Sequence, residues 1–172
     1  SISKTVGKKQ SLHFPQFLGN EKKYINECID STYVSSVGNF VNKFEDKIKE
    51  YTGSKFAICV VNGTSALQVS LLISGVGPRD EVLIPSLTFV ATANAVSYCG
   101  ATPHFIDINM NNLGIDATTT RSYLSNITKK TKKGLLNIKT KKYIKAIVPM
   151  HTFGHPCDME KIIDLAEDFN LT

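Results

Sequence analysis

From residue 56 onward, short apolar segments rich in β-branched residues alternate with longer segments whose apolar residues have helical spacing. The apolar segments are expected to be strands, at residues 56–61, 81–85, 102–108 and 143–149. The other segments are expected to be helices, at residues 65–74, 88–99, 116–126 and 158–169. Strands separated by helices form a mainly parallel sheet flanked by helices, so the pattern predicts an α/β fold.

The chain before residue 56 follows a different pattern. Residues 1–19 show no clear periodicity and are expected to form an N-terminal arm. Two amphipathic helices are expected at residues 20–31 and 40–53, joined by a loop of small residues. We therefore expect residues 20–172 to form one domain.

The composition is that of a globular protein. The chain has 172 residues, of which 42% are apolar, and no apolar run approaches the length of a membrane span. The four cysteines are far apart and lie in apolar patterns, which favours reduced thiols over a disulfide framework. We therefore expect a cytoplasmic protein without a membrane partner.

The net charge of +5 is concentrated in one segment. Residues 129–145 contain eight lysines and no acidic residue. No arginine accompanies these lysines, and Tyr143 is the one aromatic residue among them, so the stacking groups of a nucleic-acid site are nearly absent. We interpret the segment as a solvated surface loop and expect no nucleic-acid partner.

The segment Asn62-Gly63-Thr64-Ser65 lies where the first expected strand passes into a helix. The first amides of a helix have no partner within it, and the helix dipole places positive charge at this end. Gly63 allows a ligand to approach the backbone closely, and the hydroxyls of Thr64 and Ser65 add donors. The turn therefore predicts a phosphate site.

Ligands of parallel sheets bind beyond the carboxyl ends of the strands. Four segments are expected to lie together there, namely residues 62–65, residues 86–89, Asp107 and residues 150–154. We expect the carboxylate of Asp107 to brace a turn rather than to bind a ligand.

A set of motifs occurs in the order that is typical of one known family. They are Asn62-Gly63-Thr64-Ser65-Ala66-Leu67, residues 77–92, Gly100-Ala101-Thr102-Pro103, Phe105-Ile106-Asp107-Ile108 and residues 148–154. The chain thereby resembles the DegT/DnrJ/StrS nucleotide-sugar aminotransferases, which use pyridoxal 5′-phosphate, from about residue 12 to its end. The resemblance implies the N-terminal portion of the large domain of the PLP-dependent transferase fold type I, the aspartate-aminotransferase-like fold.

The resemblance also assigns roles to single residues. It implies that Gly63, Thr64 and Ser65 hold the cofactor phosphate and that Phe89 stacks on the pyridine ring. Without the resemblance, Phe89 would be interpreted as a core residue. Substrate contacts are implied for Ser35, Ser36, Gly38 and His151.

Two family motifs are not found in the sequence. One carries the aspartate that pairs with the pyridine nitrogen, and the other carries the lysine that holds the cofactor covalently. In the family, both follow the position that corresponds to Thr172. We therefore expect no catalytic residue in this chain, which would be an N-terminal fragment inactive by itself.

For the parent protein, the resemblance implies transfer of an amino group, from an amino acid such as glutamate, to a keto-deoxy nucleotide sugar. It further implies a homodimer and a place in bacterial surface-polysaccharide or sialic-acid-like sugar biosynthesis. Two alternatives stay open, a PLP-dependent sugar dehydratase of the same fold and a non-catalytic truncated or split-gene partner.

His151, His155 and Cys157 have the residue types of a zinc site. Gly154 and Pro156 make a pairing on one helix face unfavourable, and a fourth ligand is not evident. We expect no metal.

Overall fold

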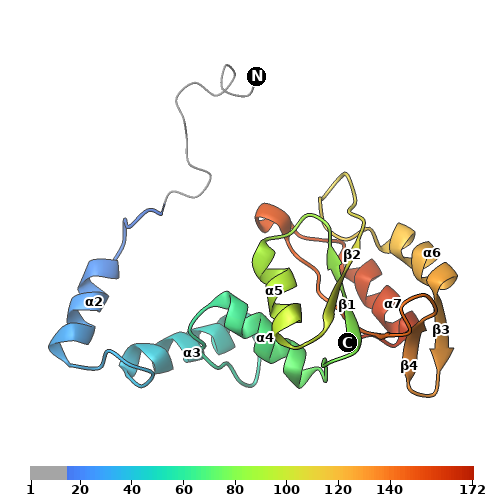
Figure 1. The fold of residues 1–172 in the computed structure, drawn as a ribbon. Helices are drawn as coiled ribbons and strands as arrows, with labels where there is room; N and C mark the ends of the chain where they lie inside the picture. Colours follow the sequence, from blue (N-terminus) through green and yellow to red (C-terminus); the bar gives the residue numbers. More distant parts are fainter. Residues whose placement is uncertain (1–14) are drawn as a thin grey trace. The chain divides into compact units, whose positions relative to one another are not determined.

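The computed structural model describes residues 15–172 (Figure 1). The chain divides into two compact units, one that ends at Cys59 and one that comprises Val60–Thr172. Most of the expected N-terminal arm lies outside the described residues, so its boundary at residue 19 stays a prediction.

The first unit contains the two expected helices, α2 (Glu21–Asp30) and α3 (Asn39–Thr52). Neither helix contains a fully buried residue. The rings of Tyr24 and Phe40 pack at a centroid distance of 5.0 Å. Glu45 accepts a hydrogen bond from the Cys59 amide at 2.8 Å, which fixes the segment that follows α3.

The strand expected at residues 56–61 is wrong. This segment has no strand pairing, and Phe56, Ile58 and Val61 are 73%, 83% and 87% exposed. β-Branched apolar residues favour a strand where a neighbouring strand and a packing surface exist. No described strand pairs with this segment, so the local preference is not realised.

The second unit contains one five-stranded sheet with the strand order β2-β1-β5-β4-β3. β1 pairs in parallel with β2 and with β5, whereas β4 pairs antiparallel with β5 and with β3. The strands are β1 (Asp80–Pro85), β2 (Thr102–Ile106), β3 (Thr128–Thr131), β4 (Gly134–Asn137) and β5 (Tyr143–Ile147). The prediction of a mainly parallel sheet is confirmed.

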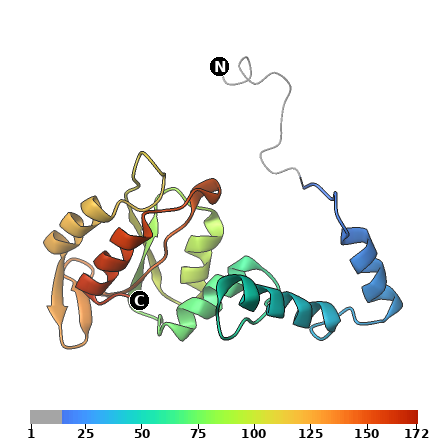
Figure 2. The same cartoon turned by 180° about the vertical axis from the view of Figure 1, so that it is seen from behind.

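Helices cover both faces of the sheet (Figure 2). They are α4 (Gly63–Ile73), α5 (Val90–Tyr98), α6 (Ala117–Ile127) and α7 (Met159–Phe169), with a short 3₁₀ helix η1 (Thr152–Gly154). Asp116 begins α6 as expected, because its carboxylate accepts hydrogen bonds from the amides of Thr119 and Thr118 at 2.9 and 3.0 Å. These bonds hold the pKa of Asp116 below its ordinary value. No helix among residues 15–172 combines the length and the apolar character needed to cross a membrane.

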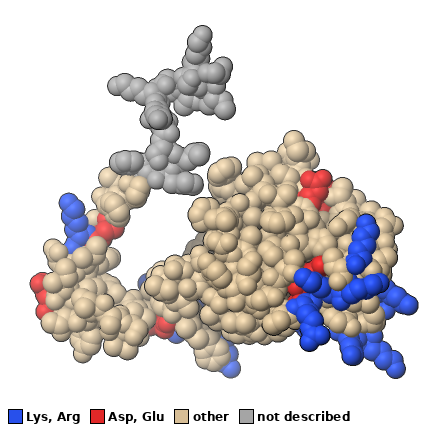
Figure 3. Space-filling model, viewed as in Figure 1, with Lys and Arg blue, Asp and Glu red and all other residues tan. Residues whose placement is uncertain are grey.

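The lysine-rich segment, expected to be a solvated loop, forms a β-hairpin. β3 and β4 pair from Thr128↔Asn137 to Thr131↔Gly134, and β4 joins the sheet through Leu135↔Ile144 and Leu136↔Tyr143. The two leucines supply the apolar contacts that a loop lacks, and Leu135 is 2% exposed. Figure 3 shows that basic side chains gather in this region.

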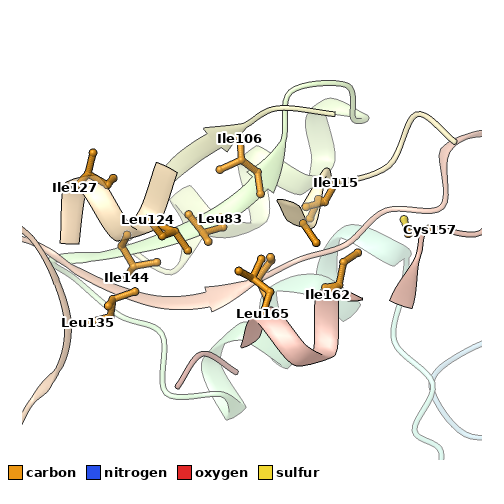
Figure 4. Close-up of a cluster of buried hydrophobic side chains, with 12 residues drawn as sticks. Leu83, Ile106, Ile115, Leu124, Ile127, Leu135, Ile144, Cys157, Ile162 and Leu165 are labelled. Carbon is orange, nitrogen blue, oxygen red and sulfur yellow. The ribbon is translucent and has the colours of Figure 1, made fainter. Parts of the chain in front are cut away.

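Two apolar clusters lie on opposite faces of β1. Leu83 packs with residues of α6 and α7 (Figure 4), whereas Val82 and Ile84 pack with residues of α4 and α5. Cys157 belongs to the first cluster and Cys99 to the second, and all four cysteines are free thiols, as expected. Cys28 and Cys59, however, are only partly buried.

A polar network lies within the sheet and includes a buried carboxylate. Glu81 is 2% exposed, and its Oε2 accepts a hydrogen bond from Asn137 Nδ2 at 2.9 Å. The same oxygen lies 2.9 Å from Nδ1 of His104, whose Nε2 lies 3.0 Å from the Tyr123 hydroxyl. Burial alone would raise the pKa of Glu81, but the hydrogen bonds from Asn137 and His104 bring it below its ordinary value of 4.5.

We expect Glu81→Gln to lower the free energy of unfolding at pH 7 by about 2 kcal/mol, because Asn137 and His104 lose a charged acceptor. Since the folded-state pKa is the lower one, the ionised carboxylate stabilises the fold above about pH 4.5. This stabilisation is lost as the pH falls through the folded-state pKa, and the variant should lack that part of the acid dependence. Urea unfolding between pH 3 and 8 measures both effects, with the exposed Glu167→Gln as control. Equal acid dependence in wild type and Glu81→Gln would contradict the assignment.

Candidate functional site

The first turn of α4 has the geometry expected of an anion site. Gly63 is the first residue of α4, and the extended Asn62 caps the helix, with its Oδ1 accepting from the Ser65 amide at 2.9 Å. The Ala66 amide donates to the Asn62 carbonyl at 3.1 Å. Among residues 15–172, no hydrogen-bond acceptor is assigned to the amides of Gly63 and Thr64. These two donors lie at the positive end of the helix dipole.

The space in front of this turn is open. A Cβ atom built on Gly63 would meet no atom within 4 Å. A phosphate group can therefore approach the backbone without displacing a side chain. The residues present thus fit the phosphate of a cofactor.

Two of the segments expected at the carboxyl edge of the sheet are in direct contact. The Thr88 hydroxyl lies 2.9 Å from Met150 Sδ and 2.9 Å from Thr92 Oγ1. The Ser86 amide donates to the Ile106 carbonyl at 2.9 Å, which brings the residue before Asp107 to the same place. Helix α4, whose first turn is the candidate anion site, packs against α5, the helix that begins at this edge.

The aromatic residue assigned to the cofactor ring lies at this edge. Phe89 precedes α5, has extended backbone angles and is 70% exposed. Its ring is therefore not part of the core of the described residues and is free to stack on a flat ligand. Its role as a stacking residue stays a prediction.

His151 is held by the turn that follows β5. Its Nδ1 accepts a hydrogen bond from the Cys157 amide at 3.1 Å, so a neutral ring carries its proton on Nε2. The Cys157 thiol donates to the Met150 carbonyl at 2.8 Å. These bonds explain the proximity of His151 and Cys157 without a metal, and no metal-type cluster is found among residues 15–172. His151 remains exposed at the edge of the site.

The two loops behind this edge are coupled. The buried Thr152 donates to the Leu113 carbonyl at 3.0 Å. Leu113 and Phe153 both have positive φ, at 57° and 53°, a region that bulky residues rarely adopt. A Cβ atom on Gly114 would lie 2.6 Å from the Cys157 sulfur, so the loops approach too closely for any larger residue.

Sequence reasoning did not single out Thr152, Leu113 or Gly114. Thr88 lies within a recognised motif, but its contact with Met150 joins residues that are 62 positions apart. No local pattern signals such a contact.

The remaining predicted contacts lie in the first unit. Ser35 and Ser36 are exposed in the turn between α2 and α3, and Gly38 precedes α3. Their roles as substrate contacts stay predictions.

A cavity of about 370 Å³ lies between β2 and α6. Asp107 borders it, together with Phe105, Ile106, Thr119, Thr120 and Tyr123. None of the residues assigned to the cofactor lines it. Asp107 Oδ1 accepts from the Ile108 amide at 2.8 Å, as expected of a carboxylate that braces a turn.

The family model described as the DegT/DnrJ/EryC1/StrS aminotransferase family matches residues 16–172. The chain belongs to this family. The resemblance noted in the sequence is thereby confirmed.

Two similar proteins show what share of a relative's length this chain covers. GDP-perosamine synthase of Escherichia coli O157:H7 is 44% identical over 157 residues, which cover 91% of this chain and 39% of the relative. The aminotransferase from Psychrobacter cryohalolentis superposes with a TM-score of 0.75 at 31% identity, covering 92% of this chain and 36% of its own. The chain thus spans about two fifths of the length of such family members.

A further solved structure contains a cofactor. NtdA from Bacillus subtilis, with bound cofactor PMP, superposes with a TM-score of 0.69 at 26% identity. The superposition covers 98% of this chain and 37% of NtdA. The fold of this chain therefore matches part of the fold of a protein that binds the cofactor PMP.

We expect Gly114→Ala to lower the free energy of unfolding by about 1–3 kcal/mol, because the new methyl group overlaps the Cys157 sulfur. Removing that sulfur in the double variant Gly114→Ala/Cys157→Ala should restore part of the loss. The rescue is partial because the Cys157 Cβ would still lie 3.2 Å from the new atom. Denaturant unfolding of both single variants and the double variant gives the coupling free energy. If the changes in the free energy of unfolding of the two single variants simply add in the double variant, the close approach of Gly114 and Cys157 is contradicted.

Proposed function

We propose that this chain is the phosphate-binding portion of a pyridoxal phosphate-dependent nucleotide-sugar aminotransferase. The observation that carries the proposal is the first turn of α4, where two amides without an assigned acceptor face open space at a helix N-terminus. Family membership over residues 16–172 supports the same conclusion. So does the PMP bound in the solved relative NtdA.

The residues of this chain have distinct roles in the proposal. The amides of Gly63 and Thr64 bind the cofactor phosphate, and the hydroxyls of Thr64 and Ser65 add hydrogen bonds. The exposed ring of Phe89 covers one face of the pyridine. Pyridoxal phosphate, when bound, accepts the amino group from one substrate and passes it to the other. His151 Nε2–H offers a donor to the substrate at the same edge.

The acceptor that we propose is a keto-deoxy sugar linked to a nucleotide, and the donor is an amino acid such as glutamate. The E. coli relative is named for a GDP-linked amino sugar, which supports amino transfer over the dehydratase alternative. Ser35, Ser36 and Gly38 are proposed to contact the sugar nucleotide. The full-length protein is proposed to be a homodimer that acts in the biosynthesis of surface polysaccharides.

Residues 1–172 are proposed to bind the cofactor phosphate without catalysing transfer. None of the lysines in this chain lies in the sequence context of the family's cofactor lysine. Exposed lysines mostly stay protonated and are poor nucleophiles near neutral pH.

Gly63→Ala tests the phosphate role without disturbing the fold. The added methyl group meets no protein atom within 4 Å, and alanine is the better helix former, so stability should be unchanged or slightly higher. The methyl group is added in the first turn of α4, beside the amides of Gly63 and Thr64, so the affinity for pyridoxal phosphate should fall roughly tenfold or more. Titration of the 172-residue chain, followed by cofactor absorbance, measures the dissociation constant.

Gly77→Ala is the matched control, because its Cβ also meets no atom within 4 Å but lies in the loop after the last residue of α4. This variant should bind like the wild type. The proposal fails if the wild type shows no saturable binding, or if both variants bind as the wild type does.

A further inference from the structure

The positive charge of the second unit is concentrated on the β3–β4 hairpin and the beginning of β5. Eight of the eleven lysines and arginines of residues 60–172 lie between residues 129 and 145, and none of the nine aspartates and glutamates does. We call these eight the lysine surface (Figure 3), namely Lys129, Lys130, Lys132, Lys133, Lys139, Lys141, Lys142 and Lys145.

The charges of the lysine surface are not neutralised. Seven of the eight side chains belong to exposed residues, and Lys142 is half-buried, with its Nζ donating to the Thr102 hydroxyl at 2.7 Å. Lys130 Nζ lies 5.8 Å from the centre of the Phe169 ring. Among residues 15–172, no carboxylate lies within 4.0 Å of any of these ammonium groups. Their fields therefore add to a strong positive potential over one surface.

Strand pairing fixes the positions of these lysines. Lys129 and Lys130 lie on β3, opposite Leu136 and Leu135 of β4. In the turn that connects β4 to β5, the buried Asn137 accepts a hydrogen bond from the Lys139 amide at 3.0 Å. The lysines are thus presented by a structured element and not by a solvated loop.

The lysine surface lies away from the proposed phosphate site. The hairpin joins the sheet at the first residues of β5, whereas the candidate site lies beyond the last residue of that strand. In Figure 4, Leu135 and Ile144 lie at one end of the cluster, and Ile115 and Cys157 at the other. Binding at the lysine surface therefore leaves the site open to its ligands.

The chemistry of this surface selects among anionic partners. Binding of single-stranded nucleic acid typically adds aromatic rings and arginine side chains, on which bases stack, to the positive charge. Here the nearby Arg121 is paired with Asp168, and Tyr143 is half-buried. A lysine on an edge strand can serve to prevent sheet pairing, but that role does not account for Lys132, Lys133, Lys139 and Lys141 at the two turns. Compact ammonium charges without a shaped pocket fit a diffuse plane of negative charge.

We propose that the lysine surface docks this protein on the anionic surface of a lipid bilayer. The association is electrostatic and peripheral, with each lysine near the bilayer adding to the attraction and salt weakening it. The proposal replaces the sequence-based expectations of a solvated loop and of no membrane partner. It does not depend on the proposed enzymatic function.

Co-sedimentation with vesicles tests the proposal. At low salt, the protein should bind vesicles of phosphatidylcholine with phosphatidylglycerol, but not vesicles of phosphatidylcholine alone, and rising salt should release it. Replacing Lys132, Lys133, Lys139 and Lys141 with glutamine should weaken binding roughly tenfold or more. Circular dichroism should be unchanged, because no ion pair or hydrogen bond is assigned to these four side chains.

A control variant with the same net charge replaces four exposed lysines of α2 and α3 with glutamine, namely Lys22, Lys23, Lys43 and Lys47. It should bind vesicles like the wild type. Equal weakening in both variants, or equal binding to uncharged vesicles, would overturn the proposal. Displacement from the vesicles by a single-stranded oligonucleotide at equal phosphate concentration would also overturn it and indicate nucleic acid instead.

Discussion

β1 determines the arrangement of the second unit, because it lies between two parallel strands and helices cover both of its faces. Val82, Leu83 and Ile84 are each 0% exposed and point alternately into the two apolar clusters. Burying each such side chain contributes about 1.5–3 kcal/mol. Since β2 and β5 run in the same direction as β1, the chain leaves all three strands at one edge. The segments that follow these three strands lie together there as a consequence of core packing.

That edge is held by contacts between segments rather than within them. Thr88 meets Met150, and Thr152 bonds to Leu113. Residues with positive φ cost about 1 kcal/mol or more, so the left-handed conformations of Leu113 and Phe153 need such external support. Helix amides and small side chains shape the phosphate turn. The proposed binding of phosphate at this turn relies on backbone geometry, which is why a methyl group can be used to probe it.

Features that depend on local interactions, such as the beginning of a helix, were predictable from short stretches of the sequence. Asp116 begins a helix because its own carboxylate bonds to the next amides. The beginning of α4 was expected at residue 65 rather than Gly63, because the cap formed by Asn62 was not recognised. The prediction of a strand at residues 56–61 was wrong, because a strand requires a distant pairing partner and no described strand supplies one. The hairpin was missed because its lysines dominate the composition, although Leu135 and Leu136 carry the pairing. The contacts that close the site edge join residues far apart and leave no trace in any short window.

Glu81 connects the interior of the sheet with the lysine surface. Its carboxylate accepts from Asn137 Nδ2, while Asn137 Oδ1 accepts from the amides of Lys139 and Thr140 at 3.0 and 3.4 Å. A run of like charges repels itself and favours an extended, solvated chain. Here the buried side-chain amide of Asn137 holds the turn between β4 and β5 against that repulsion. The buried carboxylate of Glu81 in turn orients this amide. Burying a carboxylate is costly unless it is fully hydrogen-bonded. The bond from Asn137 to the buried Glu81 in β1 therefore ties the position of the hairpin to the interior of the sheet. A loop that only needed to be solvated would require no such anchor.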